Sequence, residues 1–378
     1  MTFSITIYLS IVTAIAGVTC LVVLANLLTA PVMDVVSDTV KTGVTGEEVP
    51  LVSVLVPARN EELTIGDCLA SIGQQDYPRM EIMVLDDNSG DKTAGVVKDK
   101  MKADPRISMY RGEPLPGGWT GKNWACHQLA GKARGEYFLF MDADVRLAPY
   151  AVRGAMQKMT GKGLSLLSSF PGQVMVSPGE WLVVPLMDWL LLTFLPLVLV
   201  YRSRHTSFVA ANGQFMLWNR KDYHEMGGHR SVGGMVVEDM ELARLVKEKG
   251  KRMMTALGRS GVTCRMYDSM SAAVNGFAKN FFAGFNMHWM PFVLMVSFFL
   301  AVYLVPFFLL AMYPVFIMPV LLVLVQRLLL SLKNGQNPFW NILLHPVQMC
   351  LMGITGLYSV MAYKKGLLEW KDRKLPAG

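Results

Sequence analysis

The chain has 378 residues, of which 52% are hydrophobic and only 17% charged, and its mean hydropathy is +0.34. This composition is too apolar for an ordinary soluble domain, and the length allows one substantial domain with accessory segments. The net charge of +7 does not indicate a nucleic-acid partner, because no recognisable binding module interleaves basic and aromatic residues.

Two regions predict membrane helices. Residues 3–33 contain no charged residue and no histidine, and they exceed the roughly 20 residues that cross a bilayer. Because a basic n-region is missing, we expect a retained anchor at 1–33 rather than a cleaved signal peptide. A second region, 290–363, predicts a hairpin of two spans turning at Tyr313-Pro314, followed by a third apolar block that contains His345-Pro346. If all three segments crossed the membrane, a cytoplasmic location of the preceding domain would leave the basic tail on the outer side. Either one segment does not cross fully, or His345-Pro346 marks a re-entrant segment.

Between these regions, segments typical of strands and helices alternate, which predicts βαβ units and a parallel sheet. The predicted strands are 51–57, 81–85, 107–110 and 136–141, and the predicted helices are 63–72, 92–102 and 123–133. The carboxyl ends of parallel strands meet at one edge of a sheet, where ligands of α/β folds bind. Three of these strands end in charged residues, namely Arg59, Glu61 and Glu62, then Asp86 and Asp87, then Asp142 and Asp144. Each acid alone could be a turn or capping residue, but together they predict a site for a cation or a hydrogen-bonding ligand.

Two further segments contribute candidate residues. Lys122 begins a helix after a Gly-rich loop that lacks the Walker A spacing; it could meet a diphosphate there or be a solvated surface lysine. Glu238 and Asp239 open an amphipathic helix that ends at Gly250, where acids are also favoured by the helix dipole. Residues 181–201 are apolar, but a crossing there would separate Asp142 from Asp239. We expect interfacial or re-entrant helices, or a buried helix pair.

The motifs Val54–Glu62, Ile82–Asp91, Gly121-Lys122 and Met141-Asp-Ala-Asp144 together resemble the family-2 glycosyltransferases of the GT-A fold, over about residues 50–260. The resemblance implies that the nucleotide-sugar is bound by the loop after the first predicted strand, by the acids after the second strand, and by the residues that would contact the diphosphate. The residues implied are Pro57, Ala58, Glu61, Asp86, Asp87, Lys122 and Asp142. It implies Mg²⁺ or Mn²⁺ at Asp142 and Asp144, a hard-oxygen pair suited to these ions. It also implies a general base at Asp239, beside Glu238.

Two short sequence segments indicate a subgroup within this family. Gly118-Trp-Thr-Gly-Lys-Asn-Trp-Ala125 is similar to a run in membrane-bound members tied to carotenoid and hopanoid pathways, and the tail from Gly366 to Arg373 is similar to that of carotenoid-acid glycosyltransferases. The Gln-x-x-Arg-Trp box of processive members is missing from 275–285, which favours transfer of a single sugar.

The predicted function is an inverting, non-processive transfer of one sugar from a nucleotide-sugar, expected to be a UDP-sugar, to a lipid-soluble isoprenoid or carotenoid acceptor. The alternatives are a glycolipid or polyprenyl-phosphate acceptor, or a non-catalytic membrane scaffold or transport protein. We expect a multi-pass protein of the cell (inner) membrane with a cytoplasmic catalytic domain, which also fits five cysteines without a C-x-x-C pair. The predicted layout is an anchor at 1–33, a linker at 34–50, a GT-A domain at 51–265, an amphipathic segment at 266–289, membrane helices at 290–363 and a basic tail at 364–378.

Overall fold

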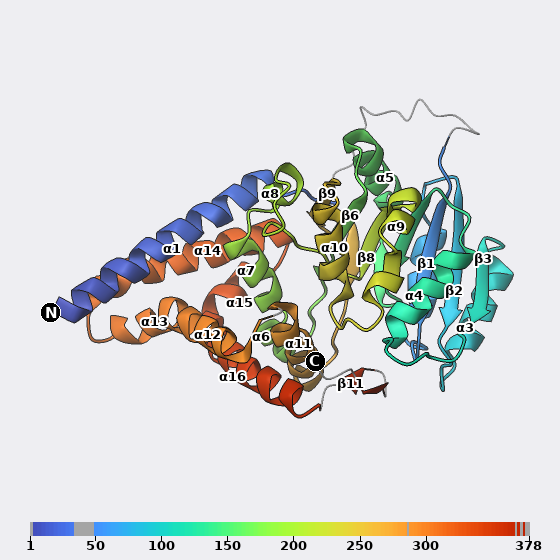
Figure 1. Cartoon of the computed structure of the whole chain (residues 1–378). Helices are drawn as coiled ribbons and strands as arrows, with labels where there is room; N and C mark the ends of the chain where they lie inside the picture. The colour runs from blue at the N-terminus through green and yellow to red at the C-terminus, as the bar shows by residue number, and fades with distance from the viewer. Residues whose placement is uncertain (1–2, 34–48, 286, 367–368, 371–372, 375–378) are drawn as a thin grey trace.

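The computed structural model describes residues 3–33, 49–285, 287–366, 369–370 and 373–374. The predicted linker at 34–50 and the basic tail at 364–378 therefore lie largely outside the described residues. The chain forms an α/β half and a helical half that lie side by side, with the N-terminal end of the first helix at the far tip of the helical half (Figure 1).

A seven-stranded mixed sheet organises the α/β half, in the order β3-β2-β1-β4-β8-β6-β9. Its strands are β1 (Val52–Ala58), β2 (Met80–Asp86), β3 (Ile107–Arg111), β4 (Tyr137–Met141), β6 (Leu166–Phe170), β8 (Phe215–Asn219) and β9 (Met253–Leu257). The first four are parallel, as the alternating pattern predicts, whereas β8 is antiparallel to both of its neighbours. A smaller sheet joins β5 (Val145–Leu147), β10 (Val262–Cys264) and β7 (Gly172–Gln173).

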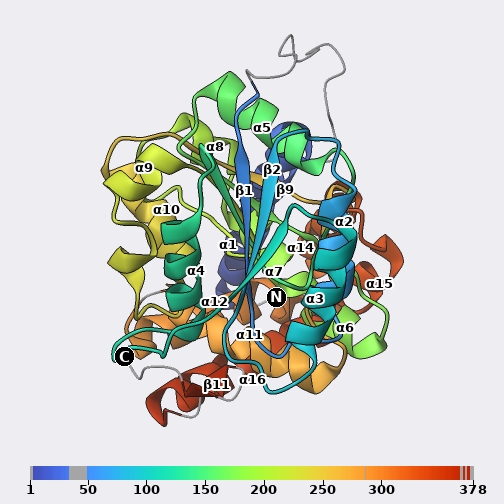
Figure 2. The same ribbon diagram turned by 90° about the vertical axis from the view of Figure 1, so that its right-hand side faces the viewer.

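Helices cover both faces of the large sheet, which is why its central strands are apolar on both sides. Along β1, Val54 and Val56 pack with α2 and α5, while Leu55 packs with α4 on the other face. Figure 2 shows α2 and α3 on one side of the strands and α4, α9 and α10 on the other. These elements are α2 (Ile65–Gly73), α3 (Thr93–Ala103), α4 (Gly121–Lys132), α5 (Ala151–Lys162), α9 (Arg220–Glu225), the 3-10 helix η2 (Gly228–Val232) and α10 (Glu238–Glu248).

The helical half contains three stretches, among the described residues, that are long and apolar enough to cross a membrane: Phe3–Thr29, Trp289–Leu310 and Pro314–Asn334. They comprise α1 (Phe3–Thr29), α12 (Trp289–Tyr303), α13 (Val305–Leu310), η3 (Pro314–Phe316) and α14 (Ile317–Asn334). These stretches fit the predicted anchor and hairpin, including the turn at Tyr313-Pro314. The Gln326 amide of α14 donates to the Ala16 carbonyl at 2.8 Å, which ties the hairpin to α1.

The last helices fold back toward the sheet. α15 (Pro338–Leu343) leads to a bend, and α16 (His345–Lys364) begins with a 2.9 Å hydrogen bond between His345 Nε2 and the carbonyl of Tyr303, near the end of α12. α16 then runs antiparallel to α12, so that Lys364 lies over the ring of Trp289, at the start of α12. The chain therefore returns to the side of the sheet, where β11 (Glu369–Trp370) and β12 (Arg373–Lys374) follow. This path fits the re-entrant alternative for His345-Pro346.

The ambiguous segment 181–201 forms short helices that are too short to span a bilayer. They are α6 (Pro178–Val183), α7 (Pro185–Phe194) and α8 (Leu197–Arg202). The side chain of Asn26 in α1 holds the break between α7 and α8: its amide donates to the carbonyls of Leu192 and Leu195, and its oxygen accepts from Leu197 N. The segment is thus fixed between the membrane helices and the sheet, beside α11 (Met270–Phe285).

Candidate active site

The charged strand ends lie together at one edge of the large sheet. Ala58 at the end of β1 is in register with Asp86 at the end of β2, and Asp87 N donates to the Ala58 carbonyl at 2.8 Å. β4 pairs with β1 on its other side and leads directly into Asp142. The parallel arrangement therefore brings together the acids that the sequence places after three separate strands.

The loops after β1 and β2 are clamped to each other. The Arg59 guanidinium donates to the carbonyls of Asp87 and Asn88, and Gly90 N donates to the Asn60 side chain at 2.9 Å. Asn60 and Asn88 both adopt positive φ, at 52° and 55°, a conformation that asparagine tolerates better than most residues. This rigid pair of loops presents Pro57, Ala58, Glu61 and Asp87 to a common cavity, whereas Asp86 caps its own turn by accepting from Ser89 N.

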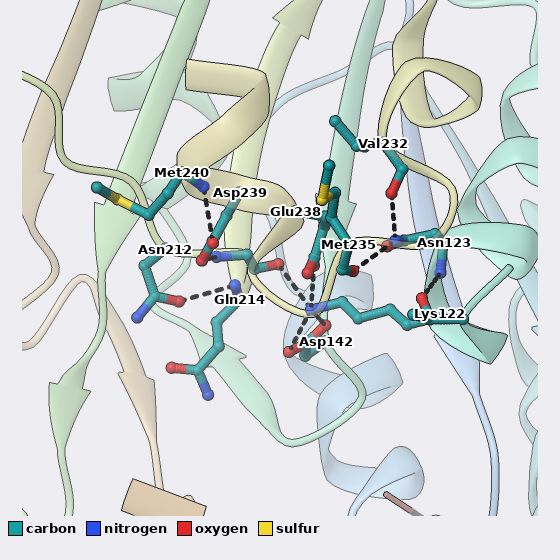
Figure 3. Close-up of polar contacts among 12 residues, drawn as sticks. Lys122, Asn123, Asp142, Asn212, Gln214, Val232, Met235, Glu238, Asp239 and Met240 are labelled. Atoms are coloured by element: carbon teal, nitrogen blue, oxygen red, sulfur yellow. Dashed lines mark hydrogen bonds and ion pairs between the residues drawn. The ribbon is translucent and has the colours of Figure 1, made fainter. Parts of the chain in front are cut away.

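Lys122 joins two acids from distant parts of the chain. Its ammonium lies 2.8 Å from Asp142 Oδ1 and 3.3 Å from Glu238 Oε1 (Figure 3). Burial alone would lower the pKa of Lys122, but the charges of Asp142 and Glu238 raise it well above its ordinary value. The lysine therefore stays charged and fixes the distance between the end of β4, at Asp142, and the start of α10, at Glu238. We call this group of charged residues the polar corner.

Two neutral residues, Asn123 and Gly213, fix the geometry of the polar corner, and neither role was predicted from the sequence. Buried Asn123 donates its amide to the carbonyls of Val232, Gly233 and Met235, which anchors the segment leading to α10. Gly213 lies so close that an added Cβ would be 2.9 Å from Lys122 Nζ and 3.0 Å from Glu238 Oε1. No spacing pattern in the sequence predicts that Asn123 anchors a distant segment or that Gly213 lies against Lys122, because both depend on contacts between segments that are far apart along the chain.

Asp239 is held rigidly at the start of α10. Its Oδ2 accepts from Gly213 N and its Oδ1 from Met240 N, both at 2.8 Å. Burial, reinforced by the negative charge of Glu238, raises the pKa of Asp239 to about 7. A carboxyl group with such a pKa can both accept and release a proton near neutral pH, as a general base requires.

Asp144 has the character of a cation ligand. Its Oδ1 is buried and has no hydrogen-bond partner within the described part of the chain. Burial raises the pKa of Asp144 to about 7, and the charges of Asp142 and Glu61 add to this effect. A divalent cation would satisfy the free oxygen and offset the repulsion, so Asp142 and Asp144 fit Mg²⁺ or Mn²⁺. No group of three or more His, Cys, Asp or Glu side chains suited to a metal occurs among the described residues, so the phosphates of a substrate would have to supply further ligands.

One cavity of about 1800 Å³ connects this polar corner to the helical half. At one end it is lined by Asp87, Asp142, Asp144 and Asp239. At the other end its lining is apolar and comes from α7, α11 and α12: Leu190, Leu191, Phe194, Phe281, Phe285, Met295, Phe298 and Phe299. A molecule with a polar head and a long apolar tail matches this division.

Comparison with known proteins agrees with this geometry. The model of glycosyl transferase family 2 matches residues 53–223. The 4,4'-diaponeurosporenoate glycosyltransferase of Staphylococcus haemolyticus (strain JCSC1435) is 28% identical over 242 residues, 63% of this chain and 63% of that protein. That of Staphylococcus aureus (strain MRSA252) is 27% identical over 237 residues, 61% of each chain. The matches thus span less than two thirds of the length of these relatives.

A solved structure is similar over nearly the whole chain. The mannosyltransferase PcManGT from Pyrobaculum calidifontis, solved in complex with GDP-Man and Mn²⁺, superimposes with a TM-score of 0.54 at 18% identity, covering 97% of this chain and 100% of that one. At this identity the likeness concerns the fold. The strand order, the acid edge and the family match lead to one conclusion: residues 53–223 form a domain that matches glycosyl transferase family 2, and the chain has the GT-A fold.

Proposed function

We propose that this protein is a membrane-associated, inverting and non-processive glycosyltransferase that moves one sugar from a nucleotide-sugar to a lipid-soluble acceptor, of isoprenoid or carotenoid type. The observation that carries the proposal is one continuous cavity, which joins Asp142, Asp144 and Asp239 to an apolar wall built from α7, α11 and α12. A soluble acceptor would not need such a wall. The Staphylococcus relatives, whose name refers to diaponeurosporenoate, support an apolar acceptor.

The residues divide the work between donor and acceptor. Pro57, Ala58, Glu61 and Asp87 line the part of the cavity proposed for the nucleoside, with Asp86 shaping the loop beside it. Asp142 and Asp144 would hold a divalent metal, which supplies positive charge to the diphosphate. Lys122 holds the Asp142 and Glu238 carboxylates in place and adds a cation to the same corner.

Asp239 is the proposed general base. With a hydroxyl acceptor, the hydroxyl oxygen of the acceptor attacks the anomeric carbon of the sugar. At the same time the bond from that carbon to the phosphate oxygen breaks. The electron pair of that bond leaves with the nucleoside diphosphate, and the hydroxyl proton passes to the Asp239 carboxylate. A carboxylate acceptor brings no such proton, so its transfer depends less on Asp239.

The charges at the helix ends support a cytoplasmic catalytic domain. Lys364 and Lys365, like Lys333 near Ala30 at the end of α1, lie on the side of the sheet. The opposite end of the helices, at Tyr313-Pro314, carries no lysine or arginine from 289 to 326. Because cytoplasmic flanks are enriched in these residues, the side of the sheet is assigned to the cytoplasm.

The test is release of nucleoside diphosphate by the purified full-length protein in detergent. UDP-glucose, UDP-N-acetylglucosamine and GDP-mannose are each supplied with Mn²⁺ and with total membrane lipid, and new glycolipids are identified by mass spectrometry. We expect release that depends on lipid and is lost in Asp144→Asn. If none of the three donors releases its nucleoside diphosphate with the membrane lipid, the proposed transfer to a lipid acceptor is contradicted and the scaffold alternative gains support.

A further inference from the structure

The helix α11 places one isolated cation in the cavity. Lys279 is the only ionisable residue in its sequence, MSAAVNGFAKNFFAGF. Both Lys279 and the neighbouring Asn280 line the cavity, and small residues (Ala272, Gly276, Gly284) occupy the turns before and after them on the same face. An added Cβ at Gly284 would meet nothing within 4 Å, which leaves room for a ligand against the helix, whereas the ring of Tyr267 already fills the space beside Gly276.

The other cations that line the cavity all have partners. Lys122 pairs with Asp142 and Glu238, Arg146 with Asp67, and Arg265 with Glu180, while Arg59 donates to backbone carbonyls. Lys279 makes no hydrogen bond or ion pair with any residue that the structure describes. A largely buried cation without a partner is costly, so an anionic ligand would stabilise it.

The charges around Lys279 place it close to the reaction centre. Burial lowers the pKa of Lys279, and the positive charge of Lys122 lowers it further, while the negative charges of Glu238, Asp142 and Asp239 oppose this shift. Nearly two turns further along α11, the cavity lining is apolar at Phe285. Lys279 thus lies where the polar corner near Asp239 meets the apolar wall, and the reacting head of a lipid-soluble acceptor must occupy this junction.

We propose that Lys279 binds the ionised carboxylate head of a long-chain apolar acid and thereby selects acidic acceptors over the corresponding alcohols. This inference rests on the proposed function and specifies its acceptor. One carboxylate oxygen pairs with the ammonium, and the other forms the new bond to the anomeric carbon. The bond to the diphosphate breaks and its electron pair leaves with the nucleoside diphosphate, so the product is a sugar ester and no proton has to be removed.

The experiment measures binding, which does not require turnover. Full-length protein in detergent is titrated with all-trans-retinoic acid, with retinol as the matched alcohol, with farnesyl phosphate and, separately, with UDP and GDP. The variants are Lys279→Gln, Lys279→Arg and, as a matched control, Lys221→Gln, which removes an exposed lysine on α9. Thermal melting of each variant shows that it is folded.

We expect the wild type to bind retinoic acid more tightly than retinol. Lys279→Gln should weaken retinoic acid binding by about tenfold or more, because a buried charge partner is lost, while retinol, UDP and GDP binding change less than about twofold. Lys279→Arg should retain most of the affinity, and Lys221→Gln all of it. If Lys279→Gln does not fold, the preference of the wild type and of Lys279→Arg for the acid still decides the matter.

Three results would overturn the proposal. The first is a wild type that shows no preference for retinoic acid over retinol. The second is weakened UDP or GDP binding in Lys279→Gln with unchanged retinoic acid binding, which would assign the lysine to the donor diphosphate. The third is tighter binding of farnesyl phosphate than of retinoic acid, which would indicate a phosphate head. Failure of the proposed function is distinguishable, since it would appear as absent nucleoside diphosphate release whatever the binding results.

Discussion

The two walls of the cavity are built in different ways. The wall that we propose for the donor, called the donor wall below, consists of residues that directly follow strands β1, β2 and β4. Its chemistry is set by short motifs and its geometry by the sheet. The wall that we propose for the acceptor, called the acceptor wall below, comes from three helices, α7, α11 and α12, that are separated along the chain and belong mostly to the helical half. A glycosyltransferase built this way can keep the donor edge constant while the helices adapt to different acceptors. The two walls should therefore respond differently to mutation.

The largest effect is expected on the donor wall. Asp144→Asn removes a charge where a divalent metal is proposed, and sugar transfer with Mn²⁺ should fall by roughly a thousandfold, because a metal contributes several kcal/mol to such reactions. Initial rates of nucleoside diphosphate release measure this. The control Asp99→Asn removes an exposed acid on α3 and should retain full activity. Undiminished transfer by Asp144→Asn would show that the metal assignment is wrong.

Asp239 lies where the walls meet, and its importance should depend on the acceptor. In Asp239→Asn, transfer to an alcohol acceptor should drop by about a hundredfold or more, as expected for a lost general base. Transfer to a carboxylic acid should drop far less, because no proton has to be removed. The kcat of the variant is compared for retinol and retinoic acid. Equal losses with both acceptors would indicate that Asp239 positions substrate rather than accepting a proton.

The pH profile tests the same residue without mutation. Because burial and Glu238 raise the pKa of Asp239 to about 7, the carboxyl group is protonated below this pH and cannot serve as a base. The kcat for an alcohol acceptor should fall about tenfold per pH unit below about 7 and level off above it. Glu238→Gln removes a charge that raises this pKa, so the acidic limb should move to lower pH. A profile that is flat from pH 5 to 8 would contradict the assignment.

Gly213→Ala should have a smaller effect, again on the donor side. The added methyl would contact Lys122 Nζ and Glu238 Oε1 at about 3 Å, and both side-chain ends must shift. We expect kcat to fall by about tenfold, since a misplacement of about 1 Å can cost up to about a hundredfold in rate. Gly131→Ala in α4 meets nothing within 4 Å and serves as the control. Equal activity of both variants would mean that Lys122 needs no fixed position.

The smallest effect is expected from Gly284→Leu on the acceptor wall. An added side chain meets nothing within 4 Å at its Cβ, so the fold should tolerate it while part of the apolar groove is filled. The KM for the acceptor should rise by about fivefold, somewhat less than the roughly 10- to 200-fold that one methylene can contribute in a closed apolar pocket, with the donor KM unchanged. Gly161→Leu, at an open position in α5, should change neither. A raised donor KM in Gly284→Leu would contradict the assignment of this wall to the acceptor alone.

Much of the donor wall could be predicted from the sequence. Apolar runs of five to seven residues ended by acids identify buried parallel strands, and parallel strands place those acids at one edge whatever the rest of the chain does. The positions of Asp87, Asp142 and Asp144, and of Glu238 and Asp239 at the start of a helix, follow from such local patterns. The apolar stretches at 3–29 and 289–334 were predictable for a similar reason, since length and composition alone make a membrane helix.

Tertiary structure alone decided how these pieces meet. Lys122 pairs with Asp142 and with Glu238, 116 positions further along the chain, and no periodicity encodes such a contact. Gly213 and Asn123 matter only because other segments approach them closely. The return of α16 beside α12 and the placement of Lys279 in the cavity likewise arise from helix packing. The sequence by itself determined which chemical groups stand at the ends of strands and helices, because local periodicity forms those elements. Packing between distant segments determined which of these groups face one another.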